Sequence, residues 1–340
     1  MRAAVLGAGT VSVVDRSEPT ASGDIVKVRI LIGPMCTEFK ERHSGAAVDV
    51  LGHEAAGVVV DPGDSRRVAV GDRVVVMPQY GCGVCWLCAA GDHIHCPDQR
   101  NVLAETGSAY GTATYAQYVL KPDWLLLPVP DDVSLRHAAL TCCGLGPTFT
   151  AANRTRIGAL DTVLVSGCGP VGLGAVVNAA VRGARVIALE VNPFRAKLAE
   201  TLGAEAIVDP TAPDVVDQIR ALTRGRGVDA AIETSGAPVA ARLIAEASRR
   251  LGRIAIVAWG NDVTFPPLVP LGVEIHGCWH WNHQRYAAGM WTVVRHAGPR
   301  LDAMVTHEFP LERVAEAMDL QDSGECGKVF LLPNGAEGWR

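Results

Sequence analysis

Four cysteines in one short stretch constrain this chain more than any other feature of its sequence. They lie at positions 82, 85, 88 and 96, which gives the spacing C-x2-C-x2-C-x7-C. Two-residue gaps let neighbouring thiolates turn toward one small ion, and a fourth thiolate from a longer loop completes a tetrahedron. The pattern predicts a closed zinc site formed by Cys82, Cys85, Cys88 and Cys96. Such a site is structural, because it leaves no coordination position open for a substrate.

The composition is that of a globular protein with room for two domains. The chain has 340 residues, of which 49% are hydrophobic and 20% charged, and its net charge is −5. The absence of a basic block argues against a nucleic-acid partner, and no apolar run reaches the roughly 18 residues that span a bilayer. The N-terminus resembles a strand more than a signal peptide. Because thiolate metal sites need reduced sulfur, we expect a cytoplasmic protein.

The first 145 or so residues are predicted to be rich in β-strands. Apolar and polar residues alternate in this region, with many Val and Ile, and Gly-Asp and Pro-containing turns separate the runs. The strand candidates lie within 1–35, 56–60, 73–77, 115–120 and 124–128. The four-cysteine stretch interrupts this part of the chain.

From about Ser134 the pattern changes to alternating helices and buried strands. Helical spacing covers 134–156, and the wholly apolar run Thr162–Ser166 begins a series of strand and helix pairs. Alternation of this kind predicts an α/β fold with a doubly wound parallel sheet, the Rossmann class. The last strand of this sheet is expected at 272–277. A helix near 286–297 and a final strand at Lys328–Leu332 follow.

A glycine-rich loop joins the first of these strands to a helix. Its sequence is Gly167-Cys-Gly169-Pro170-Val171-Gly172. In such a loop the first glycine allows a tight turn, the second lets the backbone approach a pyrophosphate, and the third permits close packing of helix on strand. The helix N-terminus then offers free N–H groups to the phosphates. The loop therefore predicts a dinucleotide cofactor.

The residue that ends the second strand indicates which dinucleotide binds. Glu190 lies eighteen residues after Gly172. A carboxylate there accepts hydrogen bonds from a ribose 2′-hydroxyl and repels a 2′-phosphate, so we expect NAD rather than NADP. Arg195, in the following helix, is placed where it could reach the adenosine end of the cofactor. The alternative for Arg195 is a solvated position on that helix.

Other potential metal ligands are scattered through the chain. Cys36, His53 and Glu54 come from neighbouring segments of the β-rich region, and Cys143 comes from the junction with the α/β region. A catalytic zinc keeps about three protein ligands and one open position. At that position it acts as a Lewis acid on a substrate hydroxyl while hydride passes to NAD. Each residue alone is weak evidence, because a buried cysteine is usually a small core residue.

Taken together, these motifs resemble the zinc-dependent medium-chain alcohol dehydrogenase family, in particular its polyol and sorbitol dehydrogenase-like members. The matching elements are Gly52-His53-Glu54, the four-cysteine lobe, the junction cysteine, the Gly167–Gly172 loop with Glu190, and Gly327-Lys328-Val-Phe. The resemblance implies a GroES-like catalytic domain at 1–144 that carries the structural zinc lobe. It also implies a Rossmann domain at 145–279 and a return to the catalytic domain at 280–340.

The same resemblance implies the metal ligands. Catalytic zinc would be held by Cys36, His53 and Cys143, with Glu54 in or near the coordination shell, and structural zinc by the four-cysteine lobe. Cys143 is preferred over Cys142 because Phe149 then falls six residues later, where the family usually has an aromatic residue.

The sequence departs from the family pattern just after Cys36. The family usually has Cys-x-Ser/Thr-Asp, whereas this chain has Cys36-Thr37-Glu38. Either one residue is missing and Thr37 and Glu38 provide the hydroxyl and the acid, or Glu38 replaces the hydroxyl and acts as a general base. The proton-relay residue therefore stays open between Thr37 and Glu38. The histidine that often follows in the family has only Glu41 or His43 as substitutes, and a solvated loop is the simpler interpretation of both.

A polar and aromatic segment follows the last Rossmann strand. It contains Trp279, His280, Trp281, Asn282 and His283. The resemblance places Trp279 and His280 near the substrate, where aromatic faces pack on sugar or cyclitol rings and polar groups bind hydroxyls. The alternative is a subunit or domain interface, in which Trp is also enriched.

These features predict an enzyme that interconverts a secondary alcohol of a sugar, cyclitol, amino sugar or polyol and its ketone, using zinc and NAD. Three alternatives remain: a dehydrogenase of simple primary alcohols or aldehydes, a zinc-free reductase of the same superfamily, and a non-enzymatic zinc and nucleotide sensor. We expect a homo-oligomer, either a dimer or a tetramer.

Overall fold

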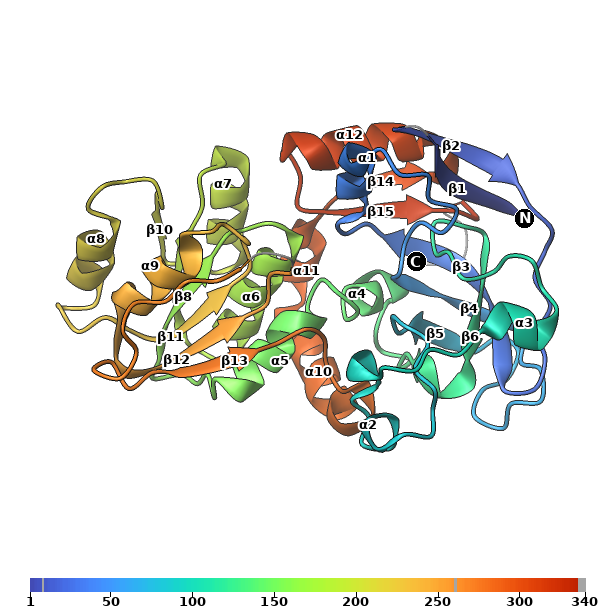
Figure 1. The fold of residues 1–340 in the computed structure, drawn as a ribbon, viewed down its shortest axis with the longest axis horizontal. Coiled ribbons are helices and arrows are strands. Elements are labelled where there is room, and N and C mark those ends of the chain that lie inside the picture. The colour runs from blue at the N-terminus through green and yellow to red at the C-terminus, as the bar shows by residue number, and fades with distance from the viewer. Residues whose placement is uncertain (8, 260–261, 336–340) are drawn as a thin grey trace. The chain divides into compact units, whose positions relative to one another are not determined.

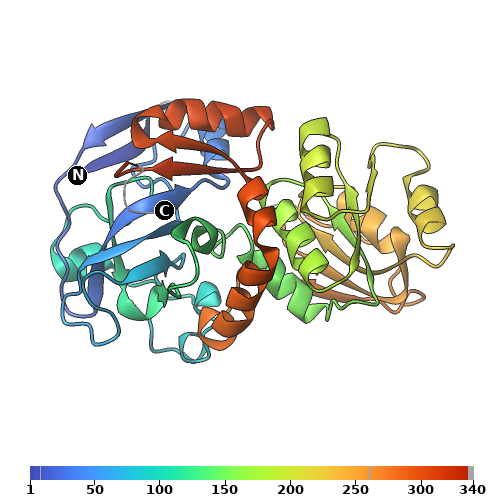
Figure 2. The ribbon, with the colours of Figure 1, turned by 180° about the vertical axis from the view of Figure 1, so that it is seen from behind.

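The computed structural model describes residues 1–7, 9–259 and 262–335, and it divides the chain into two compact units. Unit 1 contains Met1–Cys142, Asn282–Val294 and Val305–Arg340, and unit 2 contains Cys143–Trp281 and Arg295–Met304. Both ends of the chain therefore contribute to unit 1, as the blue and red colours within it show in Figures 1 and 2.

Unit 1 is built on a seven-stranded, mostly antiparallel sheet. Its strands follow the order β14-β15-β3-β4-β5-β7, and β6 pairs with β3 beside that path. A separate hairpin of β1 (Arg2–Gly7) and β2 (Thr10–Asp15) completes the β-structure. The sheet strands are β3 (Ile25–Pro34), β4 (Ala55–Asp61), β5 (Arg73–Val76), β6 (Tyr118–Pro122), β7 (Leu126–Pro128), β14 (Val305–Pro310) and β15 (Lys328–Leu332).

Strand β3 organises this unit because it pairs with three others. It lies antiparallel to β4, β6 and β15. Its alternating Val and Ile side chains suit a pleated, half-buried surface, and Val26, Val28 and Ile30 are fully buried in one core cluster. A second cluster gathers Met35, Leu51 and Tyr115 with buried residues of the C-terminal segment. The segment that follows β3 therefore packs against residues from both the N-terminal and the C-terminal parts of the chain.

The helices of unit 1 are short and lie in the connections. They are η1 (Glu38–Lys40), α1 (Glu41–Ser44), α2 (Trp86–Ala89), η2 (His93–His95), α3 (Val102–Thr106), η3 (Asp123–Leu125), α4 (Leu135–Ala139), η4 (Leu311–Arg313) and α12 (Val314–Ser323). Helix α10 (His283–Ala297) lies mostly in unit 1, and the division between the units falls near its end.

Unit 2 contains the predicted parallel sheet, and this part of the fold prediction is confirmed. Its six strands follow the order β10-β9-β8-β11-β12-β13, and every pairing is parallel. This order is that of the Rossmann fold, whose two halves meet between β8 and β11. The strands are β8 (Thr162–Ser166), β9 (Arg185–Leu189), β10 (Ala206–Val208), β11 (Val228–Glu233), β12 (Ser248–Ile256) and β13 (Glu274–Gly277).

Helices cover both faces of this sheet, which is why the central strands β8, β9 and β11 are almost wholly buried. In Figure 2, α6 and α7 lie in front of the sheet, whereas α9 lies in front of it in Figure 1. The helices of unit 2 are α5 (Gly146–Arg154), α6 (Pro170–Val181), α7 (Pro193–Leu202), α8 (Val215–Leu222), α9 (Ala240–Ala247) and α11 (Pro299–Met304). In the described part of the chain, no helix is long and apolar enough to cross a membrane.

The helical spacing over 134–156 corresponds to two helices, α4 and α5. Helix α4 ends after Ala139, and α5 begins at Gly146 with Pro147 in its first turn. Pro147 favours a helix start, because it lacks an N–H and its ring clashes with a preceding turn. The turns between the two helices contain Cys142 and Cys143, so the interruption falls at the junction cysteines.

Candidate metal and cofactor sites

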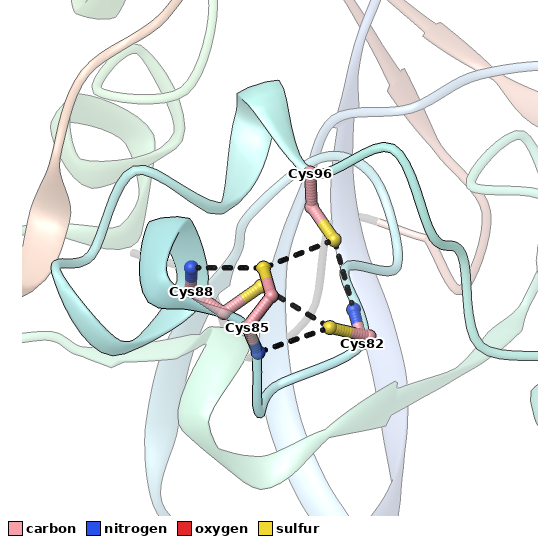
Figure 3. A group of neighbouring side chains, drawn as sticks. All are labelled: Cys82, Cys85, Cys88 and Cys96. Atoms are coloured by element: carbon pink, nitrogen blue, oxygen red, sulfur yellow. Dashed lines mark hydrogen bonds between the residues drawn. The ribbon is translucent and has the colours of Figure 1, made fainter.

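The four cysteines of the lobe converge on one point, as Figure 3 shows. Their sulfur atoms all lie within 4.8 Å of one another. The Cys85–Cys96 sulfur distance is 3.7 Å and the Cys82–Cys88 distance is 4.0 Å. These separations are far beyond the roughly 2.05 Å of a disulfide bond and fit four thiolates around one tetrahedral ion.

Backbone N–H groups also point at these sulfur atoms. Cys85 caps the N-terminus of α2, and its sulfur accepts from the N–H of Cys88 at 3.5 Å. The sulfur of Cys82 accepts from Cys85 N–H at 3.3 Å, and that of Cys96 accepts from Cys82 N–H at 3.4 Å. Hydrogen bonds to a charged form favour that form. These N–H groups favour the thiolate forms, whereas burial raises the pKa of the Cys88 thiol to about 12, so a cation is needed to hold four thiolates together. The donor set fits zinc.

A residue from the C-terminal part of the chain braces the lobe. Asn282 donates from Nδ2 to the carbonyl of Ala90 at 2.6 Å and to Asp92 Oδ1 at 3.1 Å. Between these two residues, Gly91 has a positive φ of +83°, and a Cβ there would come within 2.3 Å of Asn282. Asn282, which the sequence grouped with the polar and aromatic segment, therefore supports the lobe.

The second candidate site in unit 1 lies where β3 ends and β4 begins. The two strands are antiparallel, with Ile32 opposite Ala56. Cys36, two residues beyond β3, is therefore brought beside His53 and Glu54, which immediately precede β4. The ligand atoms of these three residues all lie within 4.8 Å of one another. A thiol, an imidazole and a carboxylate together form a donor set that suits zinc.

Glu38 lies beside this group and binds its members. Its Oε1 is 2.6 Å from Nδ1 of His53, and its Oε2 accepts from the N–H of Cys36 at 3.0 Å. Burial alone would raise the pKa of Glu38, but His53 and Tyr115 outweigh burial and hold that pKa at about 2. Burial would lower the pKa of His53, yet Glu38 and Cys36 raise it well above its ordinary value. Nδ1 of His53 therefore lies against a carboxylate at ion-pair distance, which leaves Nε2 for a metal.

Thr37 differs from Glu38 in its exposure. Thr37 is exposed and makes no capping hydrogen bond at the start of η1, whereas Glu38 is only 8% exposed. Of the two residues considered as substitutes for the missing histidine, Glu41 lies on the following short helix α1. His43 is 61% exposed and lies 3.1 Å from Asp322. These positions fit Thr37 as a hydroxyl open to solvent and Glu38 as an internal acid.

Glu54 forms a fully buried ion pair with Lys328. The distance from Lys328 Nζ to Glu54 Oε1 is 2.6 Å, and both side chains are completely inaccessible. Burial raises the pKa of Glu54 to about 7, against the lowering effect of the Lys328 ammonium. Lys328 reaches Glu54 because β15 pairs with the end of β3, with Phe330 opposite Pro34. The pairing gives a role to the Gly327-Lys328 motif, whose function the sequence did not indicate.

The junction cysteines fall at the division between the units. Cys142 is the last residue of the first segment of unit 1, where its sulfur lies 3.7 Å from the carbonyl oxygen of Val76. Cys143 follows directly as the first residue of unit 2 and is also buried. All ten cysteines lie in the described part of the chain, and no disulfide joins any of them.

The glycine loop of unit 2 has the geometry that a pyrophosphate site requires. Gly167 has a φ of +84°, and a Cβ at Gly172 would come within 1.8 Å of its carbonyl oxygen. A Cβ at Gly169, in contrast, would meet open space. Gly169 precedes α6, which begins with Pro170 and Val171 and has no side-chain cap. Backbone conformation therefore favours glycine at 167, and close packing requires it at 172. The open space at Gly169 leaves room for phosphates at the helix N-terminus.

Glu190 closes this loop from the end of β9. Its Oε2 accepts from the N–H of Cys168 at 2.7 Å, and its Oε1 accepts from the N–H groups of Val191 and Asn192 at 2.8 Å each. The charge of Arg195 acts on the Cys168 thiol, whose pKa is raised mainly by burial. Both candidate residues for the adenosine end therefore lie at the loop, which fits the ribose of a dinucleotide.

The segment predicted near the substrate divides among several environments. Within unit 2, Trp279 packs against Trp259 with ring centroids 4.8 Å apart, and His280 is 4% exposed. Trp281 is buried against Phe149, with centroids 5.8 Å apart. Trp259, which lies three residues beyond β12 and is 76% exposed, was not singled out from the sequence, because nothing in its local pattern distinguishes it.

Two further residues at the Cys36 site were also missed. Tyr115 donates its hydroxyl to Glu38 at 2.7 Å, and Gln321 donates from Nε2 to the carbonyl of Cys36 at 3.1 Å. Both are distant in sequence from their partners, and no motif contains them. A sequence pattern offers no signal for such contacts, because only the fold brings them together.

Comparisons with known proteins cover most of the chain. The model described as alcohol dehydrogenase GroES-like domain matches residues 37–131, and that described as zinc-binding dehydrogenase matches residues 170–295. An L-threonine 3-dehydrogenase of Symbiobacterium thermophilum is 32% identical over 300 residues, which cover 84% of this chain and 81% of that protein. The sorbitol dehydrogenase of Bacillus subtilis is 34% identical over 296 residues, with coverages of 84% and 81%.

A solved structure extends the likeness to the whole fold. An NAD-dependent alcohol dehydrogenase aligns with a TM-score of 0.82 and 29% identity, and the alignment covers 98% of this chain and 99% of the other. The predicted fold class, a GroES-like domain with a Rossmann domain, is thereby confirmed.

Proposed function

Because the chain belongs to the zinc-dependent medium-chain alcohol dehydrogenase family, we propose that it acts on a polyol, sugar, cyclitol or amino sugar. It is an NAD-dependent oxidoreductase that interconverts a secondary alcohol and its ketone. The observation that carries this function is the meeting of Cys36, His53 and Glu54 at the ends of β3 and β4. The relatives named for L-threonine and sorbitol support a substrate with polar groups beside its secondary alcohol.

The proposed zinc ligands are Cys36, His53 and Cys143. When bound, zinc would lower the pKa of the substrate hydroxyl, and NAD would accept the hydride. Glu38 holds Nδ1 of His53 and so presents Nε2 to the metal. Thr37 is the proposed proton relay, because its exposed hydroxyl can pass a proton to solvent whereas the Glu38 carboxylate is occupied. Glu54 stays close to the ligands, and Lys328 balances its charge.

Trp279 and His280 remain the proposed substrate residues. Both follow β13, the last strand of the half-sheet β11-β12-β13. In the Rossmann fold ligands bind beyond the carboxyl ends of the strands, and this half holds the second mononucleotide. The Trp259–Trp279 pair supplies aromatic surface at that end of the sheet. An interface role for these residues is the alternative.

A substrate panel followed by NADH absorbance tests the proposed substrate class. We expect kcat/KM for at least one polyol, cyclitol or amino sugar to exceed that for ethanol and benzyl alcohol by tenfold or more, since a site that hydrogen-bonds a hydroxyl rejects analogues that lack it (about 1.4 kcal/mol per tenfold). A preference for the simple primary alcohols would overturn the substrate class and leave the enzyme class intact.

Glu190 is expected to determine the choice of NAD. The change Glu190→Gln removes the negative charge that faces the ribose and weakens the bonds to the loop, so NADH affinity should fall by roughly tenfold. The ratio of NADPH to NADH affinity should rise at the same time. Fluorescence titration measures both, and Glu200→Gln on the neighbouring helix α7 is the control, because Glu200 pairs with the exposed Lys197 on the same helix. An unchanged ratio would place the ribose elsewhere.

We further propose that the four-cysteine lobe holds structural zinc and that the protein works in the cytoplasm as a homo-oligomer. Four close thiols that are not joined as disulfides support the first two statements. The family resemblance supports the oligomer, and light scattering of the purified protein would measure its size.

A further inference from the structure

The buried carboxylate of Glu38 has a third partner besides His53 and Cys36. The hydroxyl of Tyr115 donates to Glu38 Oε2 at 2.7 Å, and the N–H of Cys36 donates to the same oxygen at 3.0 Å. The other oxygen lies 2.6 Å from Nδ1 of His53. All four residues belong to unit 1, and Tyr115 is completely buried. The carboxylate is therefore held at three points.

Tyr115 is itself fixed by the segment that carries His53. Its N–H donates to the carbonyl of Leu51 at 3.0 Å, and its carbonyl accepts from the N–H of Ala4 at 2.8 Å. Gly52, the residue before His53, has a φ of +85°, and a Cβ there would come within 2.4 Å of the tyrosine ring. The ring therefore occupies the space that a side chain at position 52 would need. Tyr115 thus contacts the segments of both Cys36 and His53.

We propose that Tyr115 is a positioning residue that acts through Glu38 to orient His53 for metal binding. This inference rests on the proposed zinc ligation by Cys36 and His53. A glutamate side chain has several rotatable bonds, so its carboxylate can adopt many orientations. Hydrogen bonds that fix one carboxylate oxygen restrict the position of the other. With Oε2 held by Tyr115 and Cys36, Oε1 faces the imidazole and fixes the tautomer that leaves Nε2 to the metal.

Of the three partners of the Glu38 carboxylate, Cys36 and His53 are proposed metal ligands, whereas Tyr115 is not. The Cys36 N–H moves with Cys36 itself, so without the hydroxyl the carboxylate and both ligands can shift together. Tyr115 is tied instead to Leu51 and Ala4. Loss of the hydroxyl is therefore expected to loosen the site while the core around the ring stays filled, because phenylalanine has nearly the same shape.

The test compares Tyr115→Phe with Tyr80→Phe in the zinc-loaded protein. Tyr80 also donates its hydroxyl to a partner within unit 1, the carbonyl of Leu120 at 2.9 Å, but Glu38 is not that partner. We expect Tyr115→Phe to release one zinc to a chelator about tenfold faster, since loss of an outer partner of a ligand typically costs 10–100-fold. The visible spectrum of the cobalt-substituted protein should also shift. Tyr80→Phe should change neither property.

A second pair of variants distinguishes action through Glu38 from a general loss of packing. In a Glu38→Gln background, Tyr115→Phe should change zinc release by less than about twofold, because the carboxylate it positions is already absent. An equal effect in both backgrounds, or release no faster than in Tyr80→Phe, would overturn the proposal. If Cys36→Ser retains both zinc ions, the ligand assignment fails instead, and that result is separate from a failure of the Tyr115 variant alone.

Discussion

Replacing Cys36 with serine is expected to abolish measurable turnover and to reduce the zinc content from two ions to one per chain. The thiolate is a proposed ligand of the open site, and a bound metal contributes several kcal/mol of transition-state stabilisation, so kcat/KM should fall by roughly 1,000-fold or more. The fold should persist, because β3 and β4 pair independently of Cys36. Metal analysis, turnover and thermal unfolding measure the three outcomes.

A second cysteine of unit 1 provides the control. Cys326 is also buried, but it lies in a hydrophobic cluster with Met318 and Val329. We expect Cys326→Ala to retain both zinc ions and nearly normal kcat, with at most a modest loss of stability. Full turnover in Cys36→Ser would contradict the proposed chemistry and favour a zinc-free reductase, whereas the absence of turnover in the unaltered protein on any alcohol would favour a sensor.

Replacing Cys88 with serine is expected to cost stability rather than chemistry. Cys88 is 3% exposed and belongs to the four-cysteine lobe, whose elements α2 and η2 are only one turn each. Helices this short do not persist without tertiary support, so loss of the metal should unfold the lobe. Structural zinc contributes directly to folding, and a loss of several kcal/mol would lower Tm by on the order of 10 °C.

The control for this variant lies in the same lobe. Val84 is 87% exposed and contributes no ligand, so Val84→Ser should leave zinc content and Tm unchanged. At low temperature, Cys88→Ser should retain most of its kcat, since the Cys36 site has its own supports in Glu38 and Lys328. If one zinc is lost but Tm stays the same, the lobe is not a structural support. If kcat falls as far as in Cys36→Ser, the two sites are not independent.

The parts of the molecule that could be predicted are those in which residues close together in sequence form one site or one element. The four cysteines and the Gly167–Gly172 loop each lie within one short stretch of sequence, so their spacing alone indicates the geometry. Most of the parallel sheet is similarly local, because each of the strands β8, β9, β10 and β11 is followed by its own helix. Regular spacing can report such features directly.

The parts that could not be predicted depend on contacts between distant segments. Tyr115 reaches Glu38 across 77 positions, and Lys328 reaches Glu54 across 274. The Lys328 contact follows from the pairing of β15 with β3, and Tyr115 lies just before β6, which also pairs with β3. The register of these strands is set by the whole sheet. The proposal of Thr37 rather than Glu38 as the proton relay also rests on the fold. Thr37 is exposed and Glu38 is buried, because Glu38 is directed into a core that distant segments complete.

The pairing of β15 with β3 has a consequence for the order in which the protein is synthesised. The strands of unit 2 all emerge from the ribosome in one block between residues 162 and 277, so that sheet can form while the rest of the chain is still being made. Unit 1 must wait for its last strand, which begins at residue 328. Until then the Glu54 carboxylate lacks the Lys328 ammonium. Unit 1 is therefore expected to mature after the sheet of unit 2, and metal loading of its site should follow the pairing of β15 with β3.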